Sequence, residues 1–211
     1  MRDIALADTG LWACAGLAGY CFGCLSMAWI VGFLRGIDIK KAGNGNAGAS
    51  NALMVLGVVP GVVTAAWDIG KAVLAYWFMA GLFYAPREIC MLAAGMAVVG
   101  HCFPFWLDFD GGKGFAPFIG FMLCCDWKAA LLPLAAGLVL GLVSDRIVAM
   151  TFTCAALWPF LMAAAYGWRY GAAVALLSLL LFWRHRENIR KLADGTEPGI
   201  RAAFCKKTDH D

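Results

Sequence analysis

Long apolar runs dominate this chain and leave it few ways to fold. Seven runs are visible, and they cover residues 11–34, 52–84, 89–107, 115–125, 129–143, 147–166 and 171–183. Of the 211 residues, 62% are hydrophobic and only 15% are charged, and the mean hydropathy is +0.73. No soluble domain of this size can bury so much apolar side chain. The composition therefore predicts an all-α polytopic membrane protein, with residues 1–211 forming a single membrane domain of about seven transmembrane helices.

Two of the runs do not have the length of one straight transmembrane helix. The run 52–84 is too long, and Gly57, Pro60 and Gly61 predict a break that leaves a short helix followed by a full one. The run 115–125 is too short to cross an apolar layer of about 30 Å unless it is tilted or completed by flanking residues. Short or broken segments of this kind often line a polar cavity, because irregular backbone at membrane depth needs protein or water around it.

The distribution of basic residues predicts the orientation of the chain. One side of the layout carries Arg35, Lys40, Lys41, Lys113, Arg146, Arg184, Arg186, Arg190, Lys191, Arg201, Lys206 and Lys207. The other side carries Arg2, Arg87, Lys128 and Arg169, while Lys71 lies inside a span. Because basic residues concentrate on the cytoplasmic side of a membrane, we expect the N-terminus outside and the C-terminus in the cytoplasm.

Three polar motifs interrupt the apolar sequence on the predicted cytoplasmic side, within loops 36–51, 108–114 and 184–197. The first, residues 43–51, holds three glycines and three asparagines. Its glycines have the spacing of a dinucleotide fingerprint, but no strand precedes them, so that interpretation is excluded. Ser50 and Asn51 are expected to cap a helix that starts near Ala52, and such a helix start binds anions. The alternative is a flexible loop followed by a well-capped helix.

The second motif, residues 108–114, places Lys113 among three glycines. It is not a Walker A motif, yet a lysine in such a loop can reach a phosphate without hindrance. His101 lies shortly before it, near the predicted cytoplasmic end of a span. A single histidine at a helix end is more often structural than functional, but a second histidine on the same side favours a functional role.

The third motif, residues 185–188, reads His-Arg-Glu-Asn. If it is helical, His185 and Asn188 share one face. The alternative is a basic flank that merely ends the last span. Two further charges, Asp68 and Lys71, lie three residues apart within a span. Charges at membrane depth are costly, so we expect these two to pair with each other or to brace a loop.

The nine cysteines do not indicate a metal site or a disulfide framework. Most lie within apolar runs, where cysteine behaves as a small hydrophobic residue. Cys21 and Cys24 have CxxC spacing, but no second cysteine or histidine pair lies nearby.

With these three motifs, the chain resembles the bacterial acyl-phosphate:glycerol-3-phosphate acyltransferase (PlsY) family. The family motifs G-S-G-N-x-G-A-T-N, G-H-x-F-x-x-[FWY]-x-x-F-K-G-G-K-G and H-R-E-N-I-x-R-L-x-x-G-T-E are similar to residues 43–51, 100–114 and 185–197. The motifs occur in the same order and with similar spacing. Asp38, Asp68 and Lys71 also fit the family.

The resemblance implies a seven-helix fold and the transfer of a fatty acyl group from acyl phosphate to the 1-hydroxyl of glycerol 3-phosphate. The products would be lysophosphatidic acid and phosphate, as part of phospholipid biosynthesis. The enzyme would lie in the bacterial inner (cell) membrane with its active site facing the cytoplasm. No cofactor, metal or nucleic-acid partner is implied. The oligomeric state is open, and a monomer is compatible with the sequence.

The resemblance also implies roles for individual residues. The catalytic residues would be His101, Lys113, His185 and Asn188. The substrate and phosphate would be bound by Asn44, Gly45, Asn46, Gly48, Ser50, Asn51, Gly111, Gly112, Arg186 and Glu187. Asp68 and Lys71 would be structural.

The residues support this chemistry independently. An acyl phosphate is already activated, so the protein needs mainly to orient substrates and stabilise developing charge, and a substrate phosphate can take the hydroxyl proton. The H-x-x-x-x-D motif of other glycerolipid acyltransferases is missing, because Trp106 stands at the fifth position after His101. This argues against a CoA-dependent enzyme of that class.

Four positions depart from the family motifs. Asn44 stands in place of Ser, Ser50 in place of Thr, Met54 in place of Arg, and Asp110 in place of Lys. Met54 and Asp110 stand where the family has cations that would face anionic substrates. Each charge-assisted hydrogen bond lost in this way costs substrate binding about 1.5–3 kcal/mol. Two alternatives therefore stay open: a divergent acyltransferase with another acceptor, and a non-catalytic membrane protein that binds phosphate or lipid. A transporter is a weaker alternative, because no inverted repeat is visible.

Overall fold

The computed structural model describes residues 2–201, with side chains from residue 9, and that part of the chain is helical with no strand. Five segments within it are long and apolar enough to cross a membrane: Thr9–Leu34, Val58–Phe83, Arg87–Leu107, Phe115–Ser144 and Ile147–Tyr166. The fold class is therefore that of an all-α polytopic membrane protein. Lys206 and Lys207, which count toward the predicted cytoplasmic side, lie outside the described residues. The chain forms two compact units that divide between Cys125 and Asp126.

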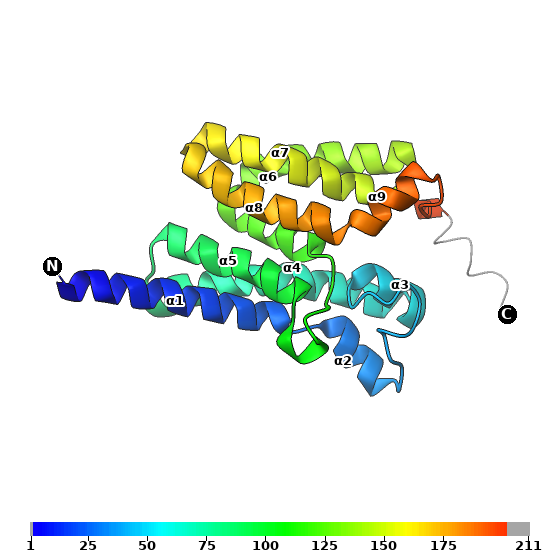
Figure 1. Cartoon of the computed structure of the whole chain (residues 1–211), viewed down its shortest axis with the longest axis horizontal. Coiled ribbons are helices and arrows are strands. Elements are labelled where there is room, and N and C mark those ends of the chain that lie inside the picture. Colours follow the sequence, from blue (N-terminus) through cyan, green and yellow to red (C-terminus); the bar gives the residue numbers. More distant parts are fainter. Residues whose placement is uncertain (1, 202–211) are drawn as a thin grey trace. The chain divides into compact units, whose positions relative to one another are not determined.

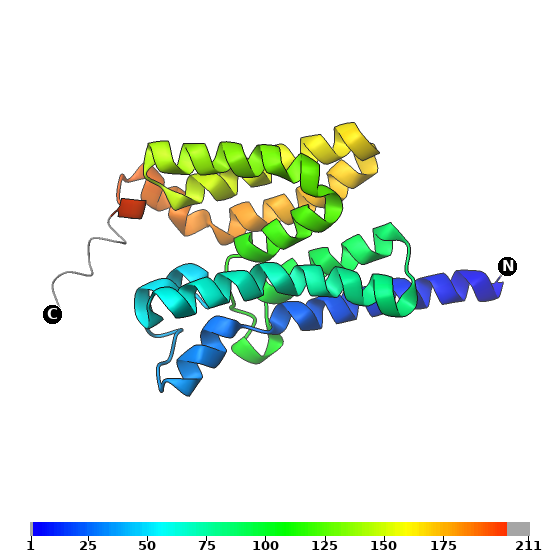
Figure 2. The ribbon, with the colours of Figure 1, turned by 180° about the vertical axis from the view of Figure 1, so that it is seen from behind.

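The first unit contains six helices and the beginning of a seventh. They are α1 (Arg2–Cys24), α2 (Met27–Leu34), α3 (Ala49–Leu56), α4 (Val58–Phe83), α5 (Arg87–Cys102), a 3₁₀ turn at Phe105–Leu107, and α6 (Phe115–Ser144) up to Cys125. Helices α1, α4 and α5 lie side by side, and α3 packs on the start of α4 (Figures 1 and 2). The two loops that carry the first and second motifs, before α3 and after α5, thus leave the same group of helices.

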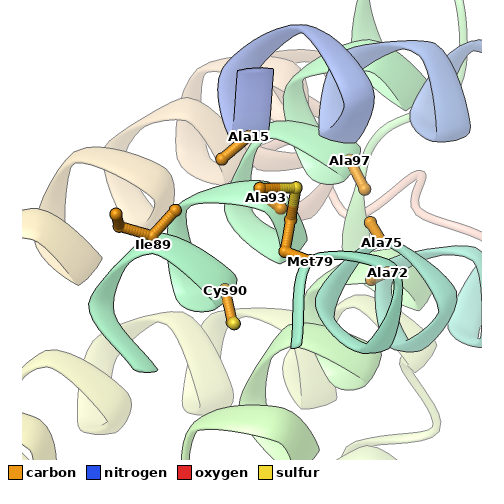
Figure 3. Packing of buried hydrophobic residues seen from close by; sticks show 8 residues of the cluster. All are labelled: Ala15, Ala72, Ala75, Met79, Ile89, Cys90, Ala93 and Ala97. Atoms are coloured by element: carbon orange, nitrogen blue, oxygen red, sulfur yellow. The ribbon is translucent and has the colours of Figure 1, made fainter. Parts of the chain in front are cut away.

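Small residues allow α1 and α5 to approach closely. A Cβ atom at Gly19 would overlap the backbone of Ala93, and one at Gly23 would overlap the backbone of Ala97. Two glycines four residues apart are the usual means of close helix packing in membranes. Figure 3 shows the adjoining core, in which Ala15 of α1 and Ala93 and Ala97 of α5 gather with residues of α4 such as Met79. The α1–α5 contact fixes the end of α5 that carries His101.

The run 11–34 is a single candidate span by composition, but it contains two helices. α1 ends at Cys24, and the Ser26 hydroxyl accepts a hydrogen bond of 3.3 Å from the Trp29 amide, which starts α2. The Leu25 carbonyl is left outside both helices, and it accepts side-chain hydrogen bonds from α4 instead. The break that the sequence predicts in the run 52–84 lies at Gly57, whose φ of 99° separates α3 from α4.

The second unit contains the rest of α6, α7 (Ile147–Tyr166), α8 (Trp168–Arg184) and α9 (Arg186–Ala193). Asp126 has non-helical angles inside α6 (φ −162°, ψ 98°). Its carboxylate accepts hydrogen bonds from the amides of Lys128 (3.1 Å) and Ala129 (3.0 Å), and from the Tyr166 hydroxyl (2.7 Å). The 115–125 and 129–143 runs therefore meet at a capped bend. α7 and α8 pack against each other along their length (Figure 1), which places the third motif at the end of α8.

Candidate active site

Asn51 organises the first motif loop. Its side chain is fully buried, and its Nδ2 donates to the carbonyls of Ile39 (2.9 Å) and Ala42 (3.0 Å), while its Oδ1 accepts from the Asn44 amide (2.9 Å). The prediction that Ser50 and Asn51 cap the next helix is wrong. α3 begins at Ala49, Gly48 is its N-cap, and no side chain caps it. The side-chain amide of Asn51 already makes its hydrogen bonds with the backbone of the loop. Asn51 therefore stabilises the loop from the first turn of α3.

The glycines and other asparagines of this loop complete its shape. Gly43 has a φ of 62°, and a Cβ atom there would overlap the Asn51 side chain. The Asn44 side chain accepts a hydrogen bond of 3.1 Å from the Asn46 amide. The Oδ1 atom of Asn46 is buried and has no hydrogen-bond partner among the described residues. A buried polar atom of this kind suits a ligand that brings a donor to the loop.

The second motif loop folds back onto the end of α5. The Gly111 amide donates to the Cys102 carbonyl and the Gly112 amide to the His101 carbonyl, both at 3.0 Å. A Cβ atom at Gly111 would overlap the His101 carbonyl oxygen, and one at Gly112 would overlap Nε2 of the His101 ring. The glycines are therefore required for the loop to lie against His101. Lys113 follows, partly buried, just before α6 begins.

The first and second loops meet. The Lys40 ammonium lies 2.6 Å from Oδ2 of Asp110 and donates to the Asp110 carbonyl at 2.8 Å. The elements just before the two loops are also in contact, because the rings of Trp29 in α2 and Trp106 in the 3₁₀ turn have centroids 4.6 Å apart. The Lys40–Asp110 ion pair thus joins the first and second motif loops within the first unit. Asp110 stands where the family has a lysine, and Lys40 brings a cation to the same place from the other loop.

A buried cluster of ionisable groups lies beneath the second loop. The expected ion pair between Asp68 and Lys71 is present, with Oδ1 and Nζ 2.8 Å apart and both side chains fully buried. The cluster also includes His101, which the sequence spacing did not connect with this pair. The Lys71 ammonium lies 2.8 Å from Nδ1 of the His101 ring.

The third motif belongs to the second unit. His185 stands at the junction of α8 and α9, is buried, and lies edge-on to Phe152. Its Nδ1 is 2.8 Å from the Leu181 carbonyl. Because a carbonyl oxygen only accepts, Nδ1 carries the hydrogen. Arg186 and Glu187 begin α9 and are both exposed.

Glu197 lies in the segment 185–197 that is similar to the third family motif, but the sequence analysis did not single it out as a site residue. It is buried, and its Oε1 accepts a hydrogen bond of 2.7 Å from Nδ2 of Asn188. A carboxylate only accepts, so this contact fixes which end of the Asn188 amide faces it. The available signal was the match of Glu197 to the last residue of the third family motif.

The structure thus forms two groups from the predicted site residues. The first unit brings together both glycine-bearing loops, His101 and Lys113. The second unit holds His185, Arg186, Glu187 and Asn188. Met54 lies exposed on α3. Among the described residues, no group of three or more His, Cys, Asp or Glu side chains is placed to hold a metal ion. Backbone N–H groups beside cations suit the binding of a phosphate.

Comparison with protein families gives a match over residues 13–195 to the model described as glycerol-3-phosphate acyltransferase. A relative of that description from Synechococcus sp. (strain CC9902) is 37% identical over 186 residues, which are 86% of this chain and 92% of the relative. Another, from Roseobacter denitrificans, is 34% identical over 207 residues, covering 95% of this chain and 98% of the relative.

Two solved structures have a similar fold. One is a crystal structure of PlsY (YgiH), an integral membrane glycerol 3-phosphate acyltransferase, in its glycerol 3-phosphate form. It gives a TM-score of 0.80 at 25% identity, covering 89% of this chain and 94% of that chain. The other is the lysophosphatidic acid form of the same protein, with a TM-score of 0.79 at 25% identity, covering 92% of this chain and 98% of that chain.

Proposed function

The chain belongs to the glycerol-3-phosphate acyltransferase family, and on this premise we propose that it transfers a fatty acyl group to glycerol 3-phosphate. The reaction yields lysophosphatidic acid, an early intermediate of phospholipid synthesis. The fold similarity to PlsY in both its glycerol 3-phosphate and lysophosphatidic acid forms supports this activity.

One observation carries the proposal: two glycine-bearing loops meet at one end of the first unit, around His101 and Lys113. Both substrates of the proposed reaction carry phosphates, so a site that handles them needs N–H donors and cations at the membrane surface. The first loop is held by Asn51, the second by its return onto α5. Contacts within the protein thus define the shape of both loops, which favours orientation of the reacting groups.

We assign acyl phosphate as the acyl donor. The 1-hydroxyl oxygen attacks the acyl carbonyl carbon, the carbon–oxygen bond to phosphate breaks, and the hydroxyl proton passes to a phosphate oxygen. No protein nucleophile is needed, because the leaving phosphate already activates the acyl group. The role of the protein is to orient the substrates and to stabilise the developing oxyanion through N–H donors. His101, Lys113, His185 and Asn188 are our candidates for these contacts.

A second candidate function, acyl transfer to a different acceptor, is favoured by Met54. This exposed apolar side chain stands where the family has a cationic one. The replacement of the family lysine by Asp110 is a weaker argument for another acceptor, because the Lys40 ammonium lies beside Asp110.

The donor is tested by supplying the purified protein, in lipidic mesophase, with glycerol 3-phosphate and either palmitoyl phosphate or palmitoyl-CoA. We expect lysophosphatidic acid from palmitoyl phosphate only. Product from palmitoyl-CoA at a comparable rate would contradict the assignment of the donor. If folded protein forms no product from either donor, the non-catalytic interpretation is favoured.

We further propose seven crossings of the bacterial inner membrane, with the N-terminus outside and all three motifs in the cytoplasm. The distribution of Lys and Arg supports this orientation. The five candidate spans, the bend of α6 at Asp126 and the 17 residues of α8 supply the crossings. Single cysteines at the exposed positions Lys41 and Lys128, in a cysteine-free chain, test it. An impermeant maleimide added to intact cells should label Lys128→Cys and spare Lys41→Cys, and the reverse pattern would contradict the orientation.

A further inference from the structure

The buried cluster under the second loop contains three ionisable side chains from two helices. Asp68 and Lys71 belong to α4, and His101 belongs to the last turn of α5. Their exposed fractions are 1%, 0% and 5%. Charges are rarely buried at such depth without a function or a partner. The charges of Asp68 and Lys71 cancel, so their pairing explains why both side chains can be buried. It does not explain why Lys71 also contacts His101, a residue of the candidate site.

The hydrogen bonds of Lys71 lead away from Asp68. Its ammonium lies 2.8 Å from Nδ1 of His101 and 3.2 Å from the Leu25 carbonyl, at the break between α1 and α2. Asp68 Oδ1 is 2.8 Å from the ammonium and 3.3 Å from Nδ1 of His101, but neither contact has the angles of a hydrogen bond. The carboxylate therefore balances the charge of Lys71, while the hydrogens of Lys71 hold the ring and the helix break.

The direction of the Lys71–His101 bond determines where the ring carries its hydrogen. An ammonium group only donates, so Nδ1 of His101 accepts. A doubly protonated ring would place its Nδ1–H 2.8 Å from that ammonium, and the Asp68 carboxylate, which lies farther from Nδ1 at 3.3 Å, already balances the charge of Lys71. The neutral ring consequently carries its hydrogen on Nε2.

The Nε2 atom faces the second motif loop. A Cβ atom at Gly112 would overlap it, so only the absence of a side chain there lets the ring edge lie against the loop. The Gly112 amide also donates to the His101 carbonyl, which holds the loop in place over the ring.

From this geometry we propose that Lys71 is a positioning residue, which holds the His101 ring in its Nε2–H form so that the ring donates a hydrogen bond to a substrate oxygen at the second loop. Asp68 balances the charge of Lys71 within the apolar interior. The inference rests on the proposed acyl transfer for its kinetic consequences, but the form of the ring is independent of it.

A double-mutant cycle tests the proposal. Removing Lys71 alone would leave a buried, unbalanced carboxylate, so the pair is replaced together as Asp68→Asn/Lys71→Met. We expect kcat for lysophosphatidic acid formation to fall roughly 10- to 100-fold, the range found when partners that orient metal-binding histidines are removed. In a His101→Ala background the same pair of changes should lower kcat no further, because Lys71 acts through the ring.

Thr64→Val provides the matched control. Thr64 is fully buried on the same helix, one turn before Asp68, and its hydroxyl has no hydrogen-bond partner among the described residues. We expect this variant to retain the parental kcat. If Asp68→Asn/Lys71→Met lowers kcat by the same factor with and without His101, or has no effect with His101 present, the proposal is overturned.

Nitrogen-15 NMR of the histidine rings tests the same proposal without substrate. The His101 signals are assigned by their loss in His101→Ala. We expect the Nε2–H form in the parental protein and a loss of this preference in Asp68→Asn/Lys71→Met. An Nδ1–H form in the parental protein would overturn the proposal even if acyl transfer is confirmed. Conversely, the Nε2–H form in a protein without acyl transfer would refute the proposed function alone.

Discussion

Replacing Gly112 by alanine should separate the second loop from His101. The added Cβ would overlap Nε2 of the His101 ring. The ring cannot rotate away without losing the hydrogen bond between its Nδ1 and the Lys71 ammonium. Relief requires either a shift of the loop or the loss of the Lys71–His101 hydrogen bond. A hydrogen bond to a charged group contributes about 1.5–3 kcal/mol, which corresponds to a fall in kcat/KM of roughly 10- to 150-fold.

The assay is the initial rate of lysophosphatidic acid formation at varied glycerol 3-phosphate, with the thermal midpoint as a measure of folding. Gly81→Ala is the matched control, since a Cβ atom at this helical position meets nothing within 4 Å. The control should keep the parental rate. Parental kcat/KM and midpoint in Gly112→Ala would refute the contact between the loop and the ring on which this reasoning depends.

Three further predictions follow from other contacts of the site. His185→Gln should retain measurable turnover, because the donor is already activated and a substrate phosphate takes the proton; complete loss from a variant with the parental thermal midpoint would contradict this. Asp110→Asn removes a carboxylate that faces anionic substrates, so the KM for glycerol 3-phosphate should fall at low ionic strength, and the difference should shrink in salt. An unchanged KM at every salt concentration would show that Lys40 already neutralises Asp110. Asn51→Ala removes three hydrogen bonds that contribute about 0.5–1.5 kcal/mol each, so its thermal midpoint should drop well below that of Lys41→Ala, a change at an exposed neighbour.

Local features of the fold could be predicted from the sequence. Gly57 marks the break between α3 and α4, because a glycine followed closely by proline and another glycine interrupts a long apolar run. The Asp68–Lys71 pair was visible as two charges one helical turn apart. Both features depend on residues that are close in sequence, which is why a pattern could indicate them.

Features that depend on distant residues could not be predicted. The break at Leu25 lies within an uninterrupted apolar run, and it is stabilised by Trp67 and Lys71, more than 40 residues away. Asn51 appeared to be a capping residue, because the carbonyls that occupy its amide lie 9 and 12 residues earlier.

Two contacts of the site show the same limit. Asp110 appeared from the family motif to be a lost cation, but Lys40, 70 residues away in the sequence, brings one to this place. His101 is likewise the third member of a cluster that spacing along α4 reveals only in part. The folded backbone thus joins the first motif loop to the second, and joins His101 to a charged pair that the sequence placed within a span.

The most direct test of the account measures phosphate release and lysophosphatidic acid from palmitoyl phosphate, with and without glycerol 3-phosphate. We predict that both products form in equal amounts and only when glycerol 3-phosphate is present. Phosphate release without lysophosphatidic acid would show that the chain uses another acceptor. The absence of both products from folded protein would contradict the assignment of an acyltransferase.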